Sequence, residues 1–326
     1  MSSAPDEVRA WAQARSEARL ARDWPEADRL RAAIEAAGWR VIDRGSHFSL
    51  GPAHAPDVVE GDRVRYGSSA AVPSRLEEAA SAFVTVVIVA IDQPSELARS
   101  LDGLRRQAPA GSQVVVVVDR PSPELEAYLL PEEGFPSDPI GGLVPEVIWT
   151  SDRLGRAGAT NAGMRRAAAP VIVLLDLGVE LTGDVLSPLV AALADPGVAV
   201  AGPWGLRSDD LRRFEPAPSG DVDAIDGAIL AFRRDDLIER GPLDERFRLD
   251  VNLDIWWSLV LRDGHGDPAR RGLAVADAPA FRLDRRTFDT LDPAERERLT
   301  RRSFYRVLDR FGSRRDLLVA SRPPQA

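Results

Sequence analysis

The sequence predicts an α/β fold in which a mostly parallel sheet is flanked by helices. Three continuous apolar runs indicate it, because strands buried on both faces of a parallel sheet lack polar alternation. These runs are FVTVVIVAI, QVVVVV and VIVLL, which begin at residues 83, 113 and 171. A helical segment separates each run from the next, which is the order that joins parallel strands through crossover helices.

The N-terminal residues 1–50 are predicted to form a small helical module. Residues 6–37 read as two helices, because apolar side chains recur there at helical spacing. Asp23 is the expected N-cap of the second helix, and Gly38 is the expected stop signal after it. A short strand is then expected at residues 39–42.

Residues 51–82 are rich in Gly, Ser, Pro and Ala, and we expect a linker with one hairpin there. The main domain is then expected over residues 83–326. Its predicted strands lie at 83–91, 113–118, 144–149, 171–175 and 198–203, and its predicted helices lie at 94–106, 156–168, 184–194 and 292–311. Residues 120–142 are expected to be a loop with one helical turn.

The composition excludes several classes of protein. The 326 residues carry a net charge of −9, and an acidic chain is a poor candidate for a dedicated nucleic-acid binder, so we expect no DNA partner. Cysteine is absent, which excludes disulfides and thiol nucleophiles. The three histidines are too far apart in sequence for a typical zinc site. The N-terminus is polar and no apolar run reaches the length of a membrane span, so a cytoplasmic location is expected.

Aspartates follow three of the predicted strands, at Asp92, Asp119 and Asp176. Each alone is commonly just a polar strand end, but together they would line one edge of one sheet. Ligands of such sheets bind outside the carboxyl ends of the strands. An acidic rim suits phosphates when a divalent cation mediates. The first strand leads into IDQPSEL, which is neither a dinucleotide fingerprint nor a P-loop, and this argues against an NAD enzyme or an ATPase.

Several motifs in register resemble family 2 glycosyltransferases of the GT-A fold. They are the opening VTVVIVAIDQPSEL, the turn VVVVVDRPS, the stretch SDRLGRAGATNAGMRRAAAPVIVLLDLGVEL, and the late block DAIDGAILAFRRDDLIERGPLDERFRLDVNLDIWWSLVLRDGHG. The resemblance covers about residues 83–265. It implies that a hexose moves, with inversion, from a UDP- or GDP-linked donor to a hydroxyl of a saccharide or lipid-linked acceptor.

The resemblance also implies which residues bind the nucleotide-sugar donor. The contacts that it places on this chain are Asp92, Asp119, Arg156, Asn161 and Asp176. It further implies a divalent cation, Mg²⁺ or Mn²⁺, with Asp176 as the first carboxylate ligand. Such hard cations prefer oxygen ligands.

The sequence departs from the family pattern at the metal ligands. Gly178 stands where the second carboxylate is usual, and the late histidine ligand is absent from AFRLDRR, which offers Asp284 instead. We expect Asp176 and Asp284 to hold the cation, with Glu180 as the other candidate replacement. The alternative is a catalytically degenerate protein that binds nucleotide or acts as a scaffold.

The catalytic base also departs from the pattern. Asn252 stands where the resemblance places the carboxylate that deprotonates the acceptor, and an asparagine cannot accept a proton. We expect Asp254 to take that role, with Asp250 as the second candidate. A helix cap is an equally good interpretation of Asp254, because the apolar Ile-Trp-Trp of a predicted helix follows it.

The two ends of the chain carry their own signals. The N-terminal stretch ARSEARLARDWPEADRLRAAIEAAGWRVIDRGSHFSL resembles a helical segment near the C-terminus of cysteinyl-tRNA synthetases. Its charges are mixed, so RNA contact is not expected, and we favour an appendage for packing or homodimerisation.

The predicted helix 292–311 is amphipathic, with arginine pairs at 301–302 and, beyond it, 314–315. Packing on the domain is the favoured role of this helix, and peripheral contact with anionic lipid is the alternative.

Overall fold

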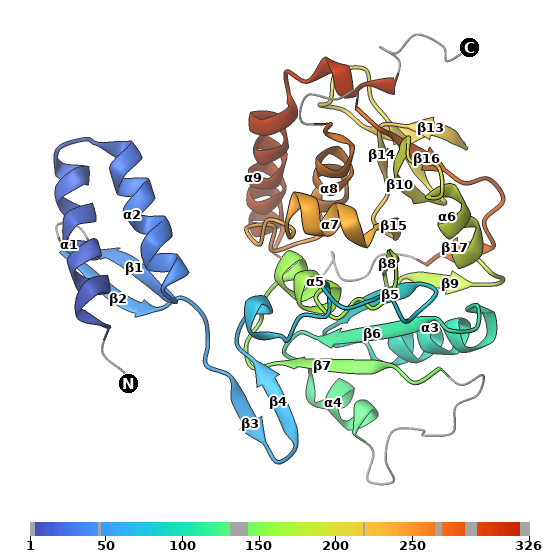
Figure 1. The fold of residues 1–326 in the computed structure, drawn as a ribbon, viewed down its shortest axis with the longest axis horizontal. Coiled ribbons are helices and arrows are strands. Elements are labelled where there is room, and N and C mark those ends of the chain that lie inside the picture. The colour runs from blue at the N-terminus through green and yellow to red at the C-terminus, as the bar shows by residue number, and fades with distance from the viewer. Residues whose placement is uncertain are drawn as a thin grey trace. The chain divides into compact units, whose positions relative to one another are not determined.

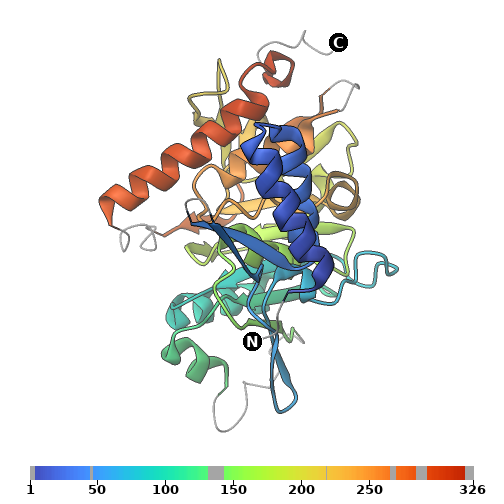
Figure 2. The same cartoon turned by 90° about the vertical axis from the view of Figure 1, so that its left-hand side faces the viewer.

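The computed structural model describes residues 4–44, 47–130, 143–217, 219–264, 269–283 and 292–319. The chain divides into two compact units, Met1–Val58 and Val59–Ala326. Figures 1 and 2 draw the first unit in blue and the second in colours from light blue to red.

The first unit packs a helical hairpin on a strand hairpin. Its elements are α1 (Asp6–Leu20), α2 (Trp24–Ala36), β1 (Trp39–Arg44) and β2 (His47–Pro52). The side chain of Asp23 accepts a hydrogen bond from the Glu26 N–H at 3.2 Å, which confirms the predicted N-cap. β1 and β2 pair antiparallel, and their apolar face lies against a small core that includes Val8, Ala12 and Ile34.

One partly buried ion pair ties the helices of the first unit to its strands. Arg15 is only 7% exposed and donates to both carboxylate oxygens of Asp43, at 3.1 and 3.2 Å. These hydrogen bonds lower the pKa of Asp43 below its ordinary value. Leu20 and Trp24, at the turn between the helices, are 84% and 56% exposed. A homodimer contact is expected at these exposed apolar side chains. That contact stays a prediction.

The second unit contains most of the chain. Its elements are β3 (Val58–Glu60), β4 (Arg63–Tyr66), η1 (Ser69–Ala71), β5 (Thr85–Ala90), α3 (Pro94–Gln107), β6 (Gln113–Val118), α4 (Pro123–Leu129), β7 (Glu146–Thr150), α5 (Arg156–Met164), β8 (Val171–Leu175), β9 (Val179–Leu181), α6 (Leu186–Ala192), β10 (Val198–Gly202), β11 (Gly205–Arg207), β12 (Glu215–Ala217), β13 (Gly220–Val222), β14 (Ala224–Ile225), β15 (Ile229–Arg233), α7 (Arg234–Arg240), α8 (Leu253–Arg262), β16 (Arg271–Ala274), β17 (Ala280–Arg282), α9 (Pro293–Phe311) and η3 (Arg315–Leu317), where η marks a 3-10 helix.

A large, mostly parallel sheet forms the centre of the second unit (Figure 1). Among the described residues it has ten strands in the order β13-β16-β10-β15-β8-β5-β6-β7-β4-β3. Strands β4, β7, β6, β5 and β8 run parallel to one another. β15 is antiparallel to both of its neighbours, β8 and β10. The predicted fold class, a mostly parallel sheet flanked by helices, is therefore confirmed.

Helices cover both faces of this sheet and bury alternate residues of each strand. On one face, α3, α4 and α6 pack against Val86, Ile88 and Ala90 of β5. On the other face, α5, α7, α8 and α9 share clusters with Val87 and Val89 of the same strand. Each central strand is thus apolar on both sides, which explains the unbroken valine-rich runs in the sequence.

Two parts of the chain add to the expectation. The segment 51–82 contains the neighbouring strands β3 and β4, as the expected hairpin requires, and β4 also pairs with β7 through Arg65 and Trp149, so the segment extends the main sheet. The boundary between the units lies inside this segment, at Val58. In addition, β15 inserts between β8 and β10, so the run at 229–233 adds an antiparallel strand to the middle of the sheet.

Candidate active site at the carboxyl edge of the sheet

The carboxyl ends of β5, β6, β7 and β8 meet at one edge of the sheet, because these strands are parallel. The antiparallel β15 brings its amino end to the same edge. The N–H of Asp176, directly after β8, donates to the carbonyl of Ala228, directly before β15, at 2.9 Å. This edge therefore gathers the aspartates predicted at strand ends and, in addition, the segment 226–228.

Asp119, at the end of β6, is completely buried and its carboxylate is fully engaged. Oδ1 accepts the N–H of Leu154 at 2.7 Å, and Oδ2 accepts the N–H of Gly155 at 3.0 Å. Thr150 Oγ1 lies 3.3 Å from Oδ1. Burial raises the pKa of Asp119 above its ordinary value, while the two N–H groups oppose that rise. These contacts hold the β7–α5 loop in place.

The same loop is held from its other side by Arg248. Its guanidinium donates to the carbonyls of Leu154 and Arg153, at 2.5 and 2.8 Å. Gly155 has φ +79°, and a Cβ there would lie 2.8 Å from Arg248 Nε. Glycine is therefore needed at this position on two grounds, the left-handed backbone and the close guanidinium. The loop places Arg156, the first residue of α5, at the carboxyl edge.

Asn161, another predicted donor contact, has its amide bound to the chain itself. It is buried within α5, its Oδ1 accepts the Leu243 N–H at 2.9 Å, and its Nδ2 donates to the Leu243 carbonyl at 2.9 Å. Nδ2 also lies 3.0 Å from Glu245 Oε1. The structure thus gives Asn161 the task of tying α5 to the segment that leads to residues 244–252.

Asp176 differs from Asp119, because its carboxylate makes no hydrogen bond or ion pair with the described residues. It is partly exposed at the end of β8. Gly178 follows, and its carbonyl accepts the Leu283 N–H at 2.7 Å. A Cβ on Gly178 would meet only the Leu283 carbonyl oxygen, at the ordinary contact distance of 3.5 Å. The backbone therefore has room for a side chain at this position.

Glu180 and Asp284 were the expected replacements for the missing carboxylate, and the structure describes only the first of them. Glu180 lies on β9 with an exposed side chain, opposite Phe281 of β17. Asp284 lies outside the described residues. Among the described residues, no three His, Cys, Asp or Glu side chains come together to hold a metal ion. The described residues thus supply part of a cation site, with Asp176 as its unpaired carboxylate.

Asp226 is a carboxylate at this edge that sequence reasoning did not find. Its Oδ1 accepts the Ala228 N–H at 3.0 Å and binds Arg282 at 2.8 Å. The guanidinium of Arg282 also stacks over the Trp204 ring at 5.2 Å. The sequence did indicate this position, because the Asp-Gly pair at 226–227 comes directly before an apolar run. It was missed because only strand ends, and no strand beginnings, were expected at this edge.

Three predicted site residues line one cavity of about 40 Å³ beside this edge. Arg156, Asp250 and Asp254 supply its charged groups. The other lining residues are Thr160, Leu174, Gly227, Leu230, Leu243, Leu253 and Trp257. Gly227 connects the cavity to the strand ends, because it lies between Asp226 and the start of β15. The sequence predicted these three residues separately, and the structure brings them together.

The two candidate bases differ in how their oxygens are used. Asp254 Oδ2 accepts the Gly227 N–H at 2.9 Å, and Oδ1 lies 2.8 Å from the Ile255 N–H. The carboxylate of Asp250 makes no such bond with any described residue, and the same holds for the Arg156 guanidinium. Asp250 therefore keeps its lone pairs free for a ligand, whereas Asp254 fixes the backbone at Gly227.

Asn252 does not line this cavity. It is the N-cap of α8 with φ 60°, a left-handed conformation that asparagine tolerates. Its Nδ2 donates to Ser303 Oγ on α9 at 3.1 Å. The residue at the position where the resemblance places the base thus links two helices, and the carboxylates on either side of it, Asp250 and Asp254, line the cavity.

Asp92 lies exposed after β5, at the same edge. The backbone next to it is already engaged, because the carbonyl of Ala90 accepts the Asp119 N–H at 2.9 Å and that of Ile91 accepts the Ser122 N–H at 3.0 Å. The exposed side chain of Asp92 is therefore the group that we expect to contact a ligand.

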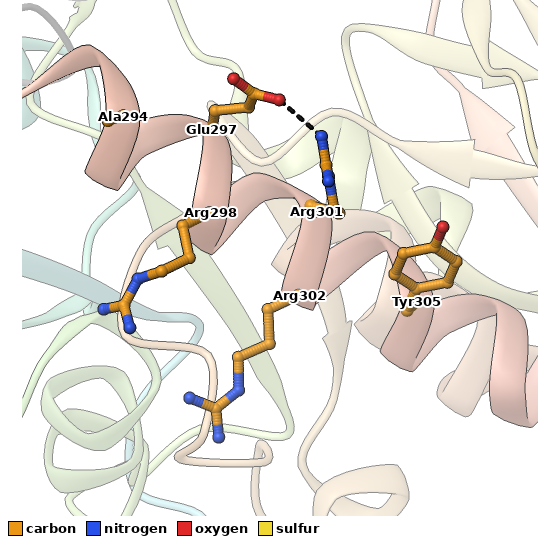
Figure 3. A pocket seen from close by; sticks show the side chains of 6 residues that line it. All are labelled: Ala294, Glu297, Arg298, Arg301, Arg302 and Tyr305. Atoms are coloured by element: carbon orange, nitrogen blue, oxygen red, sulfur yellow. Dashed lines mark hydrogen bonds and ion pairs between the residues drawn. The ribbon is translucent and has the colours of Figure 1, made fainter.

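A second, shallow pocket lies along α9 (Figure 3) and has a volume of about 380 Å³. It is lined by Ala294, Glu297, Arg298, Arg301, Arg302 and Tyr305. Two of its arginines are paired within the helix, Arg298 with Glu295 and Arg301 with Glu297, both at 2.6 Å. The pocket contains none of the predicted catalytic residues. None of the described helices is long and apolar enough to cross a membrane.

Comparison with known proteins agrees with this geometry. Residues 85–243 match the model of glycosyl transferase family 2. An N-acetylglucosaminyltransferase of Bradyrhizobium diazoefficiens is 27% identical over 137 residues, which cover 40% of this chain and 27% of that protein. This chain thus matches about a quarter of the length of its curated relative.

One solved structure, that of GalNAc-T7, supports the fold, and a second is given for its similarity alone. GalNAc-T7, solved with UDP, GalNAc and Mn²⁺, superposes with a TM-score of 0.53 at 16% identity, over 73% of this chain and 49% of that one. A mannosyltransferase from Pyrobaculum calidifontis, in complex with GDP-Man and Mn²⁺, gives a TM-score of 0.48 at 20% identity, over 66% and 61%. Residues 85–243 thus resemble family 2 glycosyltransferases in sequence, and the chain resembles a glycosyltransferase of the GT-A type in fold.

Proposed function

We propose that this chain transfers a sugar from a nucleoside-diphosphate sugar to a hydroxyl of its acceptor. One observation supports the proposal most: the charged groups of Asp176, Asp250 and Arg156 have no partner among the described residues and lie near the carboxyl edge of the sheet, in a chain that is similar to family 2. Charged groups that fold against no partner are available to a ligand. Asp119 and Asn161, by contrast, are bound to the chain, and we propose that they position the site.

We propose Asp250 as the general base that acts on the acceptor. Its carboxylate accepts the proton of the acceptor hydroxyl as that oxygen attacks the anomeric carbon, and the bond from this carbon to the diphosphate breaks. Attack from the face opposite the leaving group inverts the anomeric centre. Asp254 positions this cavity through its bond to Gly227, which modifies the sequence-based preference for Asp254 as the base.

The donor side rests on Arg156 and Asp176. The guanidinium of Arg156 has no partner among the described residues, lies beside the N-terminus of α5, and compensates the negative charge of a diphosphate. A divalent cation, when bound, supplies further neutralisation of the leaving diphosphate. We propose Asp176 as its protein ligand, together with Asp284, which lies outside the described residues. Asp92 remains our candidate for contact with the nucleoside.

A second candidate function is favoured by Gly178. Without the second carboxylate, a protein of this fold can bind a nucleotide and no longer transfer sugar efficiently. The two candidates predict the same nucleotide site and differ in their dependence on a cation and in turnover.

The acceptor is proposed to be a saccharide. Peripheral contact of α9 with anionic lipid is the alternative from the sequence, but Glu295 and Glu297 neutralise two of the arginines on its exposed face. The arginine pair at 314–315 is also partly neutralised, because Arg314 binds Asp263 and Asp316. A net attraction to anionic lipid is therefore weak at this surface.

Thermal unfolding in the presence of UDP, GDP and their sugars, with and without Mn²⁺, tests the proposal. A ligand at a concentration of about 100 Kd stabilises the folded state by about 2.7 kcal/mol, which is visible as a higher Tm. We expect one nucleotide class to raise the Tm, and Asp176→Asn to weaken the additional effect of Mn²⁺. Absence of a shift with every nucleotide contradicts both candidate functions. A shift without cation dependence or sugar transfer favours the non-catalytic one.

A further inference from the structure

One residue that lines the cavity beside Asp250 has a buried donor with no partner among the described residues. Trp257, on α8, is 1% exposed, and its ring packs edge-on against Phe232 with centroids 5.5 Å apart. Its indole N–H makes no hydrogen bond among the described residues. Buried donors in folded proteins are nearly always paired, since an unpaired one carries its full desolvation penalty. Trp257 also lines the cavity, so a group bound there is the available acceptor.

The other walls of the cavity restrict what that group is. Leu174 and Leu230 on the sheet, together with Leu243 and Leu253, supply an apolar lining. A space of about 40 Å³ holds a few atoms, given that one water needs about 10–15 Å³ by the same measure. A whole sugar ring does not fit in this space, but a substituent of a ring does.

The cavity lining carries two carboxylates and one guanidinium, so it disfavours an anionic substituent in the space between them. Asp250 and Asp254 both line the cavity, and Arg156 is the single cation among the lining residues. A carboxylate or phosphate in this cavity would be repelled by two carboxylates and attracted by one guanidinium. The fitting group is therefore neutral, offers one acceptor oxygen to the indole N–H, and carries carbon against the leucines.

An acetamido group has these properties, because its carbonyl oxygen accepts one hydrogen bond and its methyl group is apolar. We propose that this cavity binds the acetamido substituent of an N-acetylated sugar acceptor, with its carbonyl oxygen on Trp257 Nε1–H and its methyl group on Leu174 and Leu230. The inference rests on the proposed function for the location of the acceptor. Trp257 thereby becomes a specificity-determining residue of the acceptor site.

Ligand-observed saturation-transfer NMR on the full chain tests this proposal, with and without UDP. The probes are the methyl glycosides of N-acetylglucosamine and N-acetylgalactosamine, each compared with the parent glycoside that lacks the acetamido group. We expect at least one N-acetylated probe to bind about tenfold more tightly than its parent, as the loss of one buried hydrogen bond implies. Its acetamido methyl should receive the strongest saturation.

Two variants locate the effect on the indole N–H. Trp257→Phe keeps an aromatic ring and removes the donor, so the preference for the N-acetylated probe should disappear. Trp256→Phe is the matched control, because Trp256 packs on Phe247 and Phe311 and does not line the cavity. This control should keep the preference. Near-UV circular dichroism checks that both variants are folded.

Equal binding of the N-acetylated and parent probes by the wild type would overturn the inference, and so would a preference that survives in folded Trp257→Phe. If Trp257→Phe does not fold, the wild-type comparison and the saturation of the acetamido methyl decide alone. Nucleotide binding is measured separately. A Tm shift by nucleotide without acetamido preference leaves the proposed function intact and removes only this inference.

Discussion

The ends of β6 and β8 lie at the same edge of the sheet, and each carries an aspartate, but the two carboxylates are used differently. Asp119 after β6 is completely buried and accepts hydrogen bonds from two backbone N–H groups. Asp176 after β8 is partly exposed and has no partner among the described residues. The sequence makes them look equivalent. The difference teaches that one aspartate builds the loop and the other is available to a ligand.

The largest expected effect is a loss of catalytic rate when the cavity carboxylate of Asp250 is removed. Asp250→Asn removes the free carboxylate from the cavity while keeping its size. Because general bases contribute about 10²- to 10⁴-fold, kcat should fall by about 10³-fold with little change in stability. The rate of sugar transfer or of donor hydrolysis, at a saturating donor concentration, measures the change in kcat.

Asp254→Asn is the matched comparison for this prediction. It disturbs the bond to the Gly227 N–H and should affect KM and stability along with kcat. A full loss of activity in Asp254→Asn with an active Asp250→Asn would show that the base is Asp254, and would reverse the assignment of the two roles.

A second effect, a loss of stability, is expected at Asp119, whose carboxylate is hydrogen-bonded to the backbone. Asp119→Ala leaves the N–H groups of Leu154 and Gly155 buried without acceptors, so the free energy of unfolding should fall by about 3 kcal/mol. Urea unfolding measures it. Asp176→Ala, the control at the unpaired end, should change that free energy by less than about 0.5 kcal/mol. Equal losses in the two variants would remove the distinction between the two strand ends.

The smallest expected effect sharpens the role of the glycine next to Asp176. Gly178→Asp adds a carboxylate where the backbone has room for it, since among the described residues only the Leu283 carbonyl oxygen lies within 4 Å of a Cβ, at 3.5 Å. Mn²⁺ affinity should rise about tenfold relative to Gly178→Ala, because an added oxygen ligand suits a hard cation. Calorimetric titration measures this affinity. Unchanged affinity would mean that the cation, if bound, does not lie at Asp176.

Much of the fold was predictable from the sequence, because its central strands are buried on both faces and appear as unbroken apolar runs. The N-cap at Asp23 was predictable for a local reason, since the cap bonds a residue three positions along the same helix. The register of Asp92, Asp119 and Asp176 at one edge followed from the parallel order of their strands.

The uses of the polar residues were less predictable, because they depend on contacts between distant parts of the chain. Asn161 bonds Leu243, 82 residues away, and so ties two segments together. Asn252 reaches Ser303 on α9, 51 residues away. Asp226 reaches the edge only because β15 is antiparallel, which its short apolar run does not reveal. The sequence pattern predicted which edge of the sheet gathers the candidate residues, and tertiary contacts decided which of their side chains are hydrogen-bonded within the described chain.

The central claim is that ligands bind where the charged groups are unpaired. Hydrogen exchange measured by mass spectrometry, with and without saturating nucleotide sugar and Mn²⁺, tests it most directly. The account predicts slower exchange on ligand addition in residues 153–157, 176–180 and 226–228, and unchanged exchange in residues 4–44. Protection confined to other segments, or no protection in any of these three, would contradict it.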